Sequence, residues 1–172
     1  MKARYFFNFT KGNEFSSFII SISGNNLLVA LVLTMVSSLV LGMGLPTAAA
    51  YILVATLTAP ALVNMGVDLM AAHMFVFYSA MLSSITPPVA LAAFAAAAIS
   101  RDPPMRVSMV AVKYGFVAFL LPYFFVIEPR LLGEGSLLEI AGIFVTSVIG
   151  ILVLACVIQG QFINRIPLAI RG

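Results

Sequence analysis

The chain has 172 residues, of which 62% are apolar and only 9% are charged, and its formal net charge is +3. Soluble domains carry about 45–50% apolar and about 25% charged residues, and a chain this short cannot bury so much apolar surface in one core. A soluble globular domain and a disordered chain are therefore excluded. The nine basic residues are scattered, whereas nucleic-acid binding needs a basic stripe. The composition predicts an all-α polytopic membrane protein without a nucleic-acid partner.

Residues 1–26 are expected to form an N-terminal segment at the membrane interface. Residues 1–13 (MKARYFFNFTKGN) begin with basic residues, but polar residues such as Asn8 and Asn13 interrupt any apolar stretch. A cleavable signal peptide needs a continuous apolar core, so none is predicted here.

The first apolar run extends from Leu27 to Leu41, and a second extends from Thr47 to Val63. Between them, Gly42–Thr47 places two glycines and Pro46 inside apolar sequence. A membrane span needs about 20 mostly apolar residues, which neither run quite reaches. The two runs are compatible with a re-entrant helical hairpin whose turn lies at membrane depth, or with two short spans. Both alternatives return the chain to the side from which it came.

A third apolar run extends from Met70 to Ile85, is interrupted by Thr86-Pro87-Pro88, and resumes over Val89–Ile99. As one continuous helix it would be about 45 Å long, at about 1.5 Å per residue. The hydrocarbon core of a bilayer is about 30 Å thick. The sequence therefore predicts a discontinuous or strongly tilted helix here.

Two further spans are predicted over Val107–Ile127 and Ile140–Ile158. The chain is thus divided into residues 1–26, a hairpin with a broken helix over 27–100, and C-terminal spans with a tail over 101–172. The basic residues of the 101–113 connection and of the tail lie two spans apart, so the positive-inside rule places both on the cytoplasmic face. Three N-terminal basic residues conflict with this orientation because they would be external: Lys2, Arg4 and Lys11.

The two interruptions are the candidate functional positions. Where a helix breaks inside a membrane, unwound carbonyls suit a desolvated cation and helix N-termini suit an anion. Gly42 and Gly44 allow the backbone to bend, Thr47 and Thr86 add hydroxyl groups, and Ser83 belongs to a polar stripe that leads into the second break. The alternative is a pair of kinked helices whose serines and threonines bond back to their own backbone. Both interpretations remain open at this level.

Longer motifs carry a resemblance to a known family. They are residues 42–51 (GMGLPTAAAY), residues 73–78 (HMFVFY), residues 82–93 (LSSITPPVALAA) and residues 122–124 (PYF) with Glu128-Pro129. Together they resemble the C-terminal part of the fused permease, the large membrane subunit of tripartite ATP-independent periplasmic (TRAP) transporters. The resemblance covers roughly Asn25–Leu132 well and the last helix loosely, whereas residues 1–14 match nothing in the family.

The resemblance implies an elevator-type secondary transporter driven by Na⁺. It implies that Leu27–Val63 is a transport-domain hairpin and that Met70–Ile99 is a discontinuous helix. Carried over to this sequence, the ion- and substrate-binding positions are Gly42, Gly44, Pro46, Thr47, Ser83, Thr86, Pro87 and Pro88. Na⁺ is expected near Gly42, Gly44 and Thr86, as a coupling ion and without any other cofactor.

The resemblance also implies partners and a location. A periplasmic substrate-binding protein would deliver a small organic acid, and import would proceed through a multi-pass protein of the bacterial inner membrane. The sequence contains the hairpin and the Thr-Pro-Pro break once each, so we expect a C-terminal portion of a permease. Its partner would be the N-terminal half or a complementary membrane subunit.

Two other function classes fit the same features. A channel or pore subunit could use the same unwound backbone, and a non-transporting accessory or truncated membrane protein would need none of it. An enzyme is not predicted, because the sequence shows no paired intramembrane carboxylates, metal-ligand cluster or Ser/His/Asp set. His73, the single histidine, is expected to be structural, and Tyr51 is expected to pack.

Overall fold

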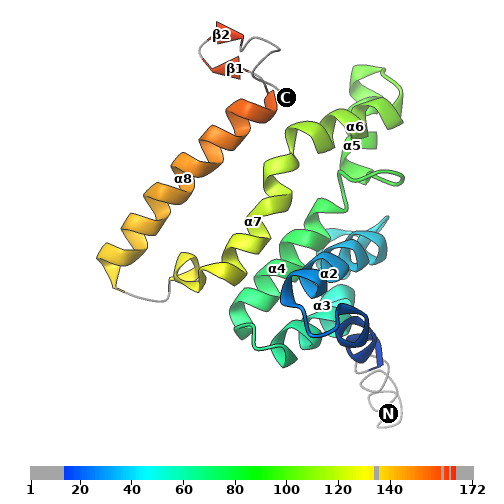
Figure 1. Cartoon of the computed structure of the whole chain (residues 1–172). Helices are drawn as coiled ribbons and strands as arrows, with labels where there is room; N and C mark the ends of the chain where they lie inside the picture. The colour runs from blue at the N-terminus through cyan, green and yellow to red at the C-terminus, as the bar shows by residue number, and fades with distance from the viewer. Residues whose placement is uncertain (1–13, 134–135, 160, 163, 166–172) are drawn as a thin grey trace.

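The structure is a computed structural model that describes residues 14–133, 136–159, 161–162 and 164–165. These residues form a helical molecule that ends in a small two-stranded ribbon (Figure 1). The elements are an N-terminal helix (Glu14–Ser23), α2 (Leu27–Gly42), α3 (Thr47–Asn64), α4 (Leu69–Leu82), α5 (Leu91–Ser100), α6 (Pro104–Tyr114), α7 (Phe116–Ile127), the 3₁₀ helix η1 (Pro129–Leu132), α8 (Leu137–Gln159), β1 (Gln161–Phe162) and β2 (Asn164–Arg165).

Every described element long enough to enter a membrane is a helix, as the predicted all-α class requires. The small ribbon of β1 and β2 is the exception to that class. Its two strands pair antiparallel, with Gln161 opposite Arg165 and Phe162 opposite Asn164. Two-residue strands are too short for an alternating apolar pattern to reveal them. Lys2, Arg4 and Lys11, which conflicted with the predicted orientation, lie outside the described residues, as does the tail beyond Arg165.

The N-terminal helix packs on the hairpin. The Ser16 hydroxyl donates to the Leu57 carbonyl of α3 at 3.0 Å, and Ile19 is buried in the core. Residues 14–23 of the predicted interfacial segment are therefore part of the helical bundle.

Helices α2 and α3 form an antiparallel hairpin. The Asn26 side chain accepts a hydrogen bond from Val29 N and caps α2, as asparagine commonly does at a helix N-terminus. The turn follows at Gly42, with Leu45 N donating to the Gly42 carbonyl at 3.2 Å and Gly44 at φ +75°. Such a φ strains any residue with a Cβ, which explains the glycine. Pro46 precedes α3 and presets the backbone for helix entry.

The predicted break in the third apolar run is confirmed and is longer than the Thr-Pro-Pro triplet. Helix α4 is capped by the Asp68 carboxylate, which accepts from Met70 N and Ala71 N at 2.7 and 3.1 Å. It ends at Leu82, and α5 begins only at Leu91. The chain between them runs through consecutive turns, and Ala92 N donates back to the Ser84 carbonyl at 2.9 Å.

The core lies where α2, α3, α4 and α7 meet (Figure 1). Small residues such as Ala30 on α2 and Ala72 on α4 are fully buried and let the helices approach closely. Tyr123 of α7 joins two of these helices, since its hydroxyl lies 3.6 Å from the Met35 sulfur and its ring stacks edge-on against Phe75 at 5.2 Å. Met35 of α2 and Phe75 of α4 therefore both lie next to Tyr123 in the core.

The span predicted over Val107–Ile127 is present as two helices, and it is bent. Helices α6 and α7 meet at an angle of 45° at Gly115. A Cβ at Gly115 would lie 2.9 Å from the Ala111 carbonyl and 3.0 Å from the Ile85 side chain. Because glycine has no Cβ, the bend at Gly115 can pack against Ile85 in the loop between α4 and α5.

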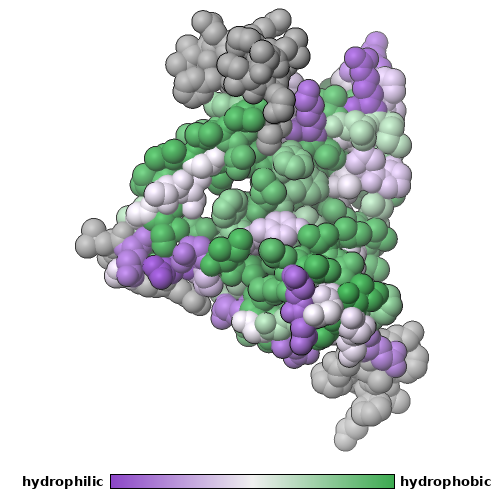
Figure 2. Space-filling view, viewed as in Figure 1, coloured by the Kyte–Doolittle hydropathy of each residue, from purple (hydrophilic) through white to green (hydrophobic). Residues whose placement is uncertain are grey.

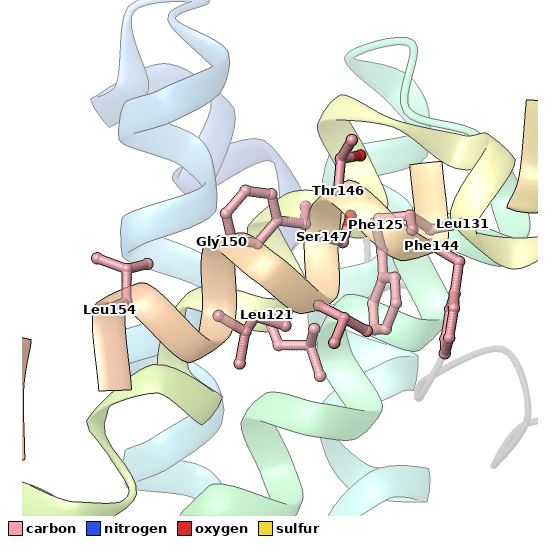
Figure 3. A pocket seen from close by; sticks show the side chains of 11 residues that line it. Leu121, Phe125, Leu131, Phe144, Thr146, Ser147, Gly150 and Leu154 are labelled. Carbon is pink, nitrogen blue, oxygen red and sulfur yellow. The ribbon is translucent and has the colours of Figure 1, made fainter. Parts of the chain in front are cut away.

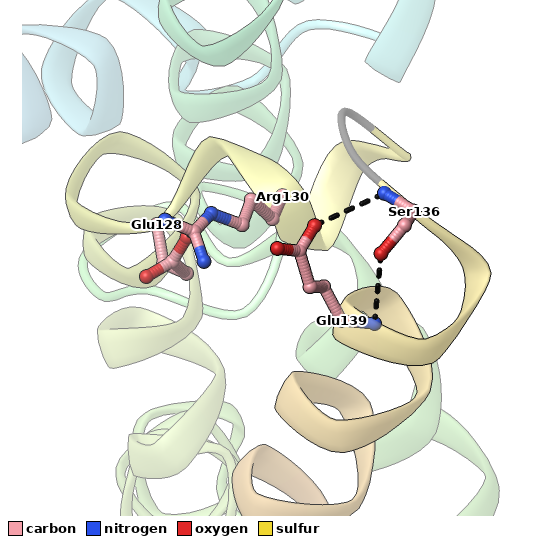
Figure 4. A network of polar contacts seen from close by, with 4 residues as sticks. All are labelled: Glu128, Arg130, Ser136 and Glu139. Carbon is pink, nitrogen blue, oxygen red and sulfur yellow. Dashed lines mark hydrogen bonds and ion pairs between the residues drawn. The ribbon is translucent and has the colours of Figure 1, made fainter.

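Helix α8 begins with a reciprocal cap (Figure 4). Ser136 N donates to the Glu139 carboxylate at 3.1 Å, and Glu139 N donates to the Ser136 hydroxyl at 3.4 Å. This arrangement is a capping box and fixes the start of the helix. Nearby, Arg130 and Glu128 form an ion pair at 3.3 Å on the exposed connection between α7 and α8.

The surface confirms a multi-pass membrane protein. Apolar side chains cover most of the face shown in Figure 2, and polar residues gather at the ends of the helices. Among the described residues, α3 and Glu139–Val157 of α8 are long and apolar enough to cross a membrane, and α6 with α7 adds a bent third span. None of the Glu139–Val157 stretch is buried within the chain, so lipid or another protein must cover it.

Candidate functional site at the contact between the two interruptions

The structure brings the hairpin turn and the helix break together. A Cβ added to Gly42 would lie 2.8 Å from the Ser83 hydroxyl oxygen, 3.2 Å from its Cβ and 3.4 Å from the Ala80 carbonyl. Gly42 and Ser83 are both buried, and Ser83 is only 2% exposed. Two predicted site residues that are far apart in the sequence are therefore in direct contact.

A second contact joins the same two segments. A Cβ on Gly44 would lie 3.5 Å from a methyl group of Val89, which follows the two prolines. The turn thus lies against the break at both of its glycines. Gly44 itself is exposed, whereas Gly42 is enclosed.

The hydroxyl groups of the break bond back to their own helix. Ser83 donates to the Ala80 carbonyl at 2.6 Å, and Thr86 donates to the Leu82 carbonyl at 2.8 Å. The local bonding expected from the kinked-helix alternative is therefore present. Each hydroxyl oxygen still keeps lone pairs after donating its proton, so these bonds leave the oxygens able to accept or to coordinate.

The loop between α4 and α5 frees backbone carbonyls. Thr86 O accepts from Ala90 N at 3.2 Å, and Ser84 O accepts from Ala92 N. Among the described residues, the carbonyls of Ile85, Pro87 and Pro88 accept no backbone hydrogen bond. Pro87 is half-buried and Pro88 is exposed, so these oxygens lie at the edge of the packed core.

The N-termini of α3 and α5 lie next to the turn and the break. Helix α3 starts at Thr47, which is exposed together with Pro46, and α5 starts at Leu91 directly after the break. The N–H groups of a first helical turn have no partner within the helix and carry partial positive charge. Hydroxyl oxygens, free carbonyls and two helix N-termini are therefore available within two segments that touch.

A family model of the tripartite ATP-independent periplasmic transporter, DctM component, matches residues 5–140. The chain belongs to the DctM family. No match was found among curated proteins or among solved structures. The family match confirms the resemblance inferred from the motifs, and it identifies the chain as a component of a transporter.

The extent of the family match corrects one prediction. Residues 1–14 were expected to match nothing in the family, but the DctM match begins at residue 5. Few apolar repeats or breakers mark this stretch, so inspection for motifs missed it. At the other end the match stops at residue 140, near the start of α8.

Sequence reasoning also missed a bond between the hairpin and α4 of this DctM-family chain. The Tyr51 hydroxyl lies 3.0 Å from Nδ1 of His73, and the Tyr51 ring packs edge-on against Phe77 at 5.6 Å. His73 therefore has a hydrogen-bond partner, and Tyr51 both packs and bonds. The polar character of the lone histidine was the available signal, but the sequence does not show which hydroxyl it meets.

Several hydroxyl-bearing residues on α2 and α4, or directly after α4, are buried. Thr34, Ser38, Ser79 and Ser83 are each at most 2% exposed. Ser38 and Ser79 donate to carbonyls of their own helices at 2.6 and 2.7 Å. The Thr34 hydroxyl has no hydrogen-bond partner within the part of the chain that the structure describes.

The structure also has a cavity away from this contact. One cavity of about 480 Å³ lies between α7 and α8, and its lining is mostly apolar, with Phe125 and Phe144 among the residues that line it (Figure 3). It includes none of the predicted site residues. The described residues contain no group of three or more histidine, cysteine or acidic side chains that could hold a metal ion.

Proposed function

We propose that this chain forms the ion- and substrate-binding part of an elevator-type secondary transporter that couples Na⁺ to the import of a small organic acid. The observation that carries the proposal is the contact of Gly42 with Ser83, which joins the hairpin turn to the helix break. Paired interruptions that meet are typical of the substrate site in secondary transporters. The DctM family match supports a transporter component.

The cation part of the proposal rests on oxygen atoms. Na⁺ would bind near Gly42, Gly44 and Thr86, where the carbonyls of the break are free of backbone bonds. A dehydrated hard cation needs several oxygen ligands, and carbonyl and hydroxyl groups supply them without adding charge. The Ser83 and Thr86 hydroxyls keep accepting lone pairs and contribute to the same shell.

The anion part rests on helix N-termini. The first turn of α3 at Pro46-Thr47 offers N–H groups and partial positive charge. The N-terminus of α5 after Pro87-Pro88 adds partial positive charge, while its Ala92 N–H is already bonded to the Ser84 carbonyl. A carboxylate of a small organic acid is the complementary ligand. The chain has no arginine between Arg4 and Arg101, so in this region backbone donors take the place that a side-chain guanidinium often fills.

We further propose the setting in which this site works. The hairpin is re-entrant, with its turn at membrane depth, and the protein lies in the bacterial inner membrane. A periplasmic binding protein delivers the acid. An inverted counterpart of the hairpin and the broken helix comes from an N-terminal half of the permease or a complementary membrane subunit, because this sequence carries each element once.

The test is uptake by the complete transporter in proteoliposomes. We expect accumulation of a labelled organic acid, presented by the binding protein, when an inward Na⁺ gradient is applied, and no accumulation when K⁺ replaces Na⁺. Uptake that ignores Na⁺ would contradict the coupling. Single-channel currents across a bilayer containing the same assembly would instead favour a channel or pore subunit, which also fits the features of the sequence.

A further inference from the structure

Helix α6 differs from the other helices of this protein. It carries Arg106 and Lys113 among mostly apolar residues, while Met105, Met109 and Tyr114 are exposed. A helix with basic residues and an exposed apolar side is typical of the membrane interface. Ile99 at the end of α5 is 86% exposed, so an apolar environment is needed on both sides of the α5–α6 turn.

A cavity of about 390 Å³ lies between α5 and α6. Ser100, Asp102 and Arg106 line it near the turn, whereas Ala96 and Val110 line it one helical turn further along each helix. With Val107 these apolar residues continue the lining away from the charged end. The cavity therefore has a polar end and an apolar end, as an amphiphile requires.

The charges around the turn favour an anion. The segment 101–113 contains one acidic residue, Asp102, and three basic residues: Arg101, Arg106 and Lys113. The only ion pair among the described residues is that of Arg130 with Glu128, so none of these three basic groups forms an ion pair with a carboxylate in the part of the chain that the structure describes. The N-terminus of α6 at Pro104 adds partial positive charge beside Arg106.

The carboxylate of Asp102 limits which kind of anionic headgroup can bind in the cavity. Its carboxylate lines the polar end together with the Ser100 hydroxyl, which accepts from Asp102 N at 3.4 Å. A bare phosphate would be repelled by this carboxylate at close range, whereas a headgroup that also carries hydroxyl donors can bond to it. Phosphatidylglycerol combines a phosphate with such hydroxyls and with acyl chains.

We propose that the cavity between α5 and α6 binds an anionic glycerophospholipid of the phosphatidylglycerol type. Arg106 holds the phosphate, Asp102 and Ser100 meet the headgroup hydroxyls, and one acyl chain runs along the apolar end at Ala96, Val107 and Val110. With the predicted orientation, this lipid belongs to the cytoplasmic leaflet. The inference does not rest on the proposed Na⁺ site, because it concerns the opposite end of α5.

The experiment uses the full chain purified in a non-ionic detergent and titrated with phosphatidylglycerol, with bound lipid counted by native mass spectrometry. We expect Arg106→Gln to weaken binding by about tenfold, which is the usual effect of losing a hydrogen bond to a charged group. Lys113→Gln removes the same charge from the same helix outside the cavity and serves as the matched control. Ala96→Leu, which fills the apolar end, is expected to weaken binding while leaving every charge in place.

The outcomes separate the proposal from its rivals. Loss in Arg106→Gln and Ala96→Leu, with little change in Lys113→Gln, supports the site. Equal loss in Arg106→Gln and Lys113→Gln would show diffuse charge attraction and overturn it. Equal binding of phosphatidylcholine, or displacement of the lipid by inorganic phosphate, would also overturn it, the latter by pointing to a free-phosphate site. Unchanged elution of each variant on size exclusion verifies that it is folded.

Discussion

Gly42 packs so closely on Ser83 that a single added carbon would lie 2.8 Å from the serine oxygen. That oxygen is fixed, because its proton is donated to the Ala80 carbonyl at 2.6 Å. The contact joins the end of α2 to the end of α4 and so holds the hairpin turn on the helix break. Any change at either residue therefore acts on both interruptions at once.

Gly42→Ala is expected to destabilise the protein by about 1–3 kcal/mol, the usual effect of overpacking a close contact. Thermal or denaturant unfolding in detergent measures it. Gly142→Ala on α8 is the control, because a Cβ there meets nothing within 4 Å. Adding Ser83→Gly makes room for the new methyl group and should restore part of the loss. Equal stability of Gly42→Ala and Gly142→Ala would refute the contact.

Gly44→Val should abolish or strongly reduce transport while the protein still reaches the membrane. Gly44 has φ +75°, a conformation that costs a β-branched residue about 1–3 kcal/mol, and it faces Val89. Gly66→Val is the matched control, since Gly66 has φ +89° at the far end of α3 and nothing within 4 Å. Uptake normalised to membrane level distinguishes them. Similar losses in both variants would show that backbone strain alone, rather than the position at the turn, is responsible.

Thr86→Ala should raise the Na⁺ concentration needed for half-maximal uptake by about tenfold, because it removes one oxygen from the proposed cation shell. The control is Thr146→Ala on α8, where the hydroxyl also bonds back to its own helix, at 3.1 Å from the Gly142 carbonyl. An unchanged Na⁺ dependence in Thr86→Ala would remove this residue from the shell.

Tyr51→Phe should cost about 1 kcal/mol of stability, the net contribution of a neutral hydrogen bond, because it removes the bond to His73. The ring contact with Phe77 is retained, so packing is preserved. A double-mutant cycle with His73→Phe measures the coupling directly. Additive effects of the two substitutions would show that the bond contributes nothing.

Thr34→Val should leave stability unchanged or raise it by about 1 kcal/mol. It replaces a fully buried hydroxyl without a partner among the described residues by a methyl group of similar shape. Ser38→Ala, which removes a bonded hydroxyl one turn away, is expected to be mildly destabilising instead. Marked destabilisation by Thr34→Val would mean that the hydroxyl has a partner in the assembled transporter.

Much of the fold could be predicted from the sequence because glycine and proline inside apolar runs are strong signals. Gly42–Thr47 and Thr86–Pro88 marked the hairpin turn and the helix break where the structure has them. These signals act locally, through backbone conformation and missing donors. They can be interpreted without knowing which residues pack against these segments.

The remainder depends on contacts between distant residues, which no local pattern encodes. The bend at Gly115 is fitted to Ile85, and the pairing of Gly42 with Ser83 follows from how α2 packs on α4. The unpartnered Thr34 hydroxyl is likewise visible only once its surroundings are known. The binding roles of all the predicted positions stay predictions, because the contacts show where these residues lie and not what they bind: Gly42, Gly44, Pro46, Thr47, Ser83, Thr86, Pro87 and Pro88.

The central claim is that the hairpin turn and the helix break together bind Na⁺. Equilibrium binding of radioactive Na⁺ to the purified complete transporter tests it most directly, with wild type compared with Thr86→Ala and with the control Thr146→Ala. We predict saturable binding in wild type and in the control, and about tenfold weaker binding in Thr86→Ala. Saturable binding of equal strength in all three proteins, or none in wild type, would contradict the claim.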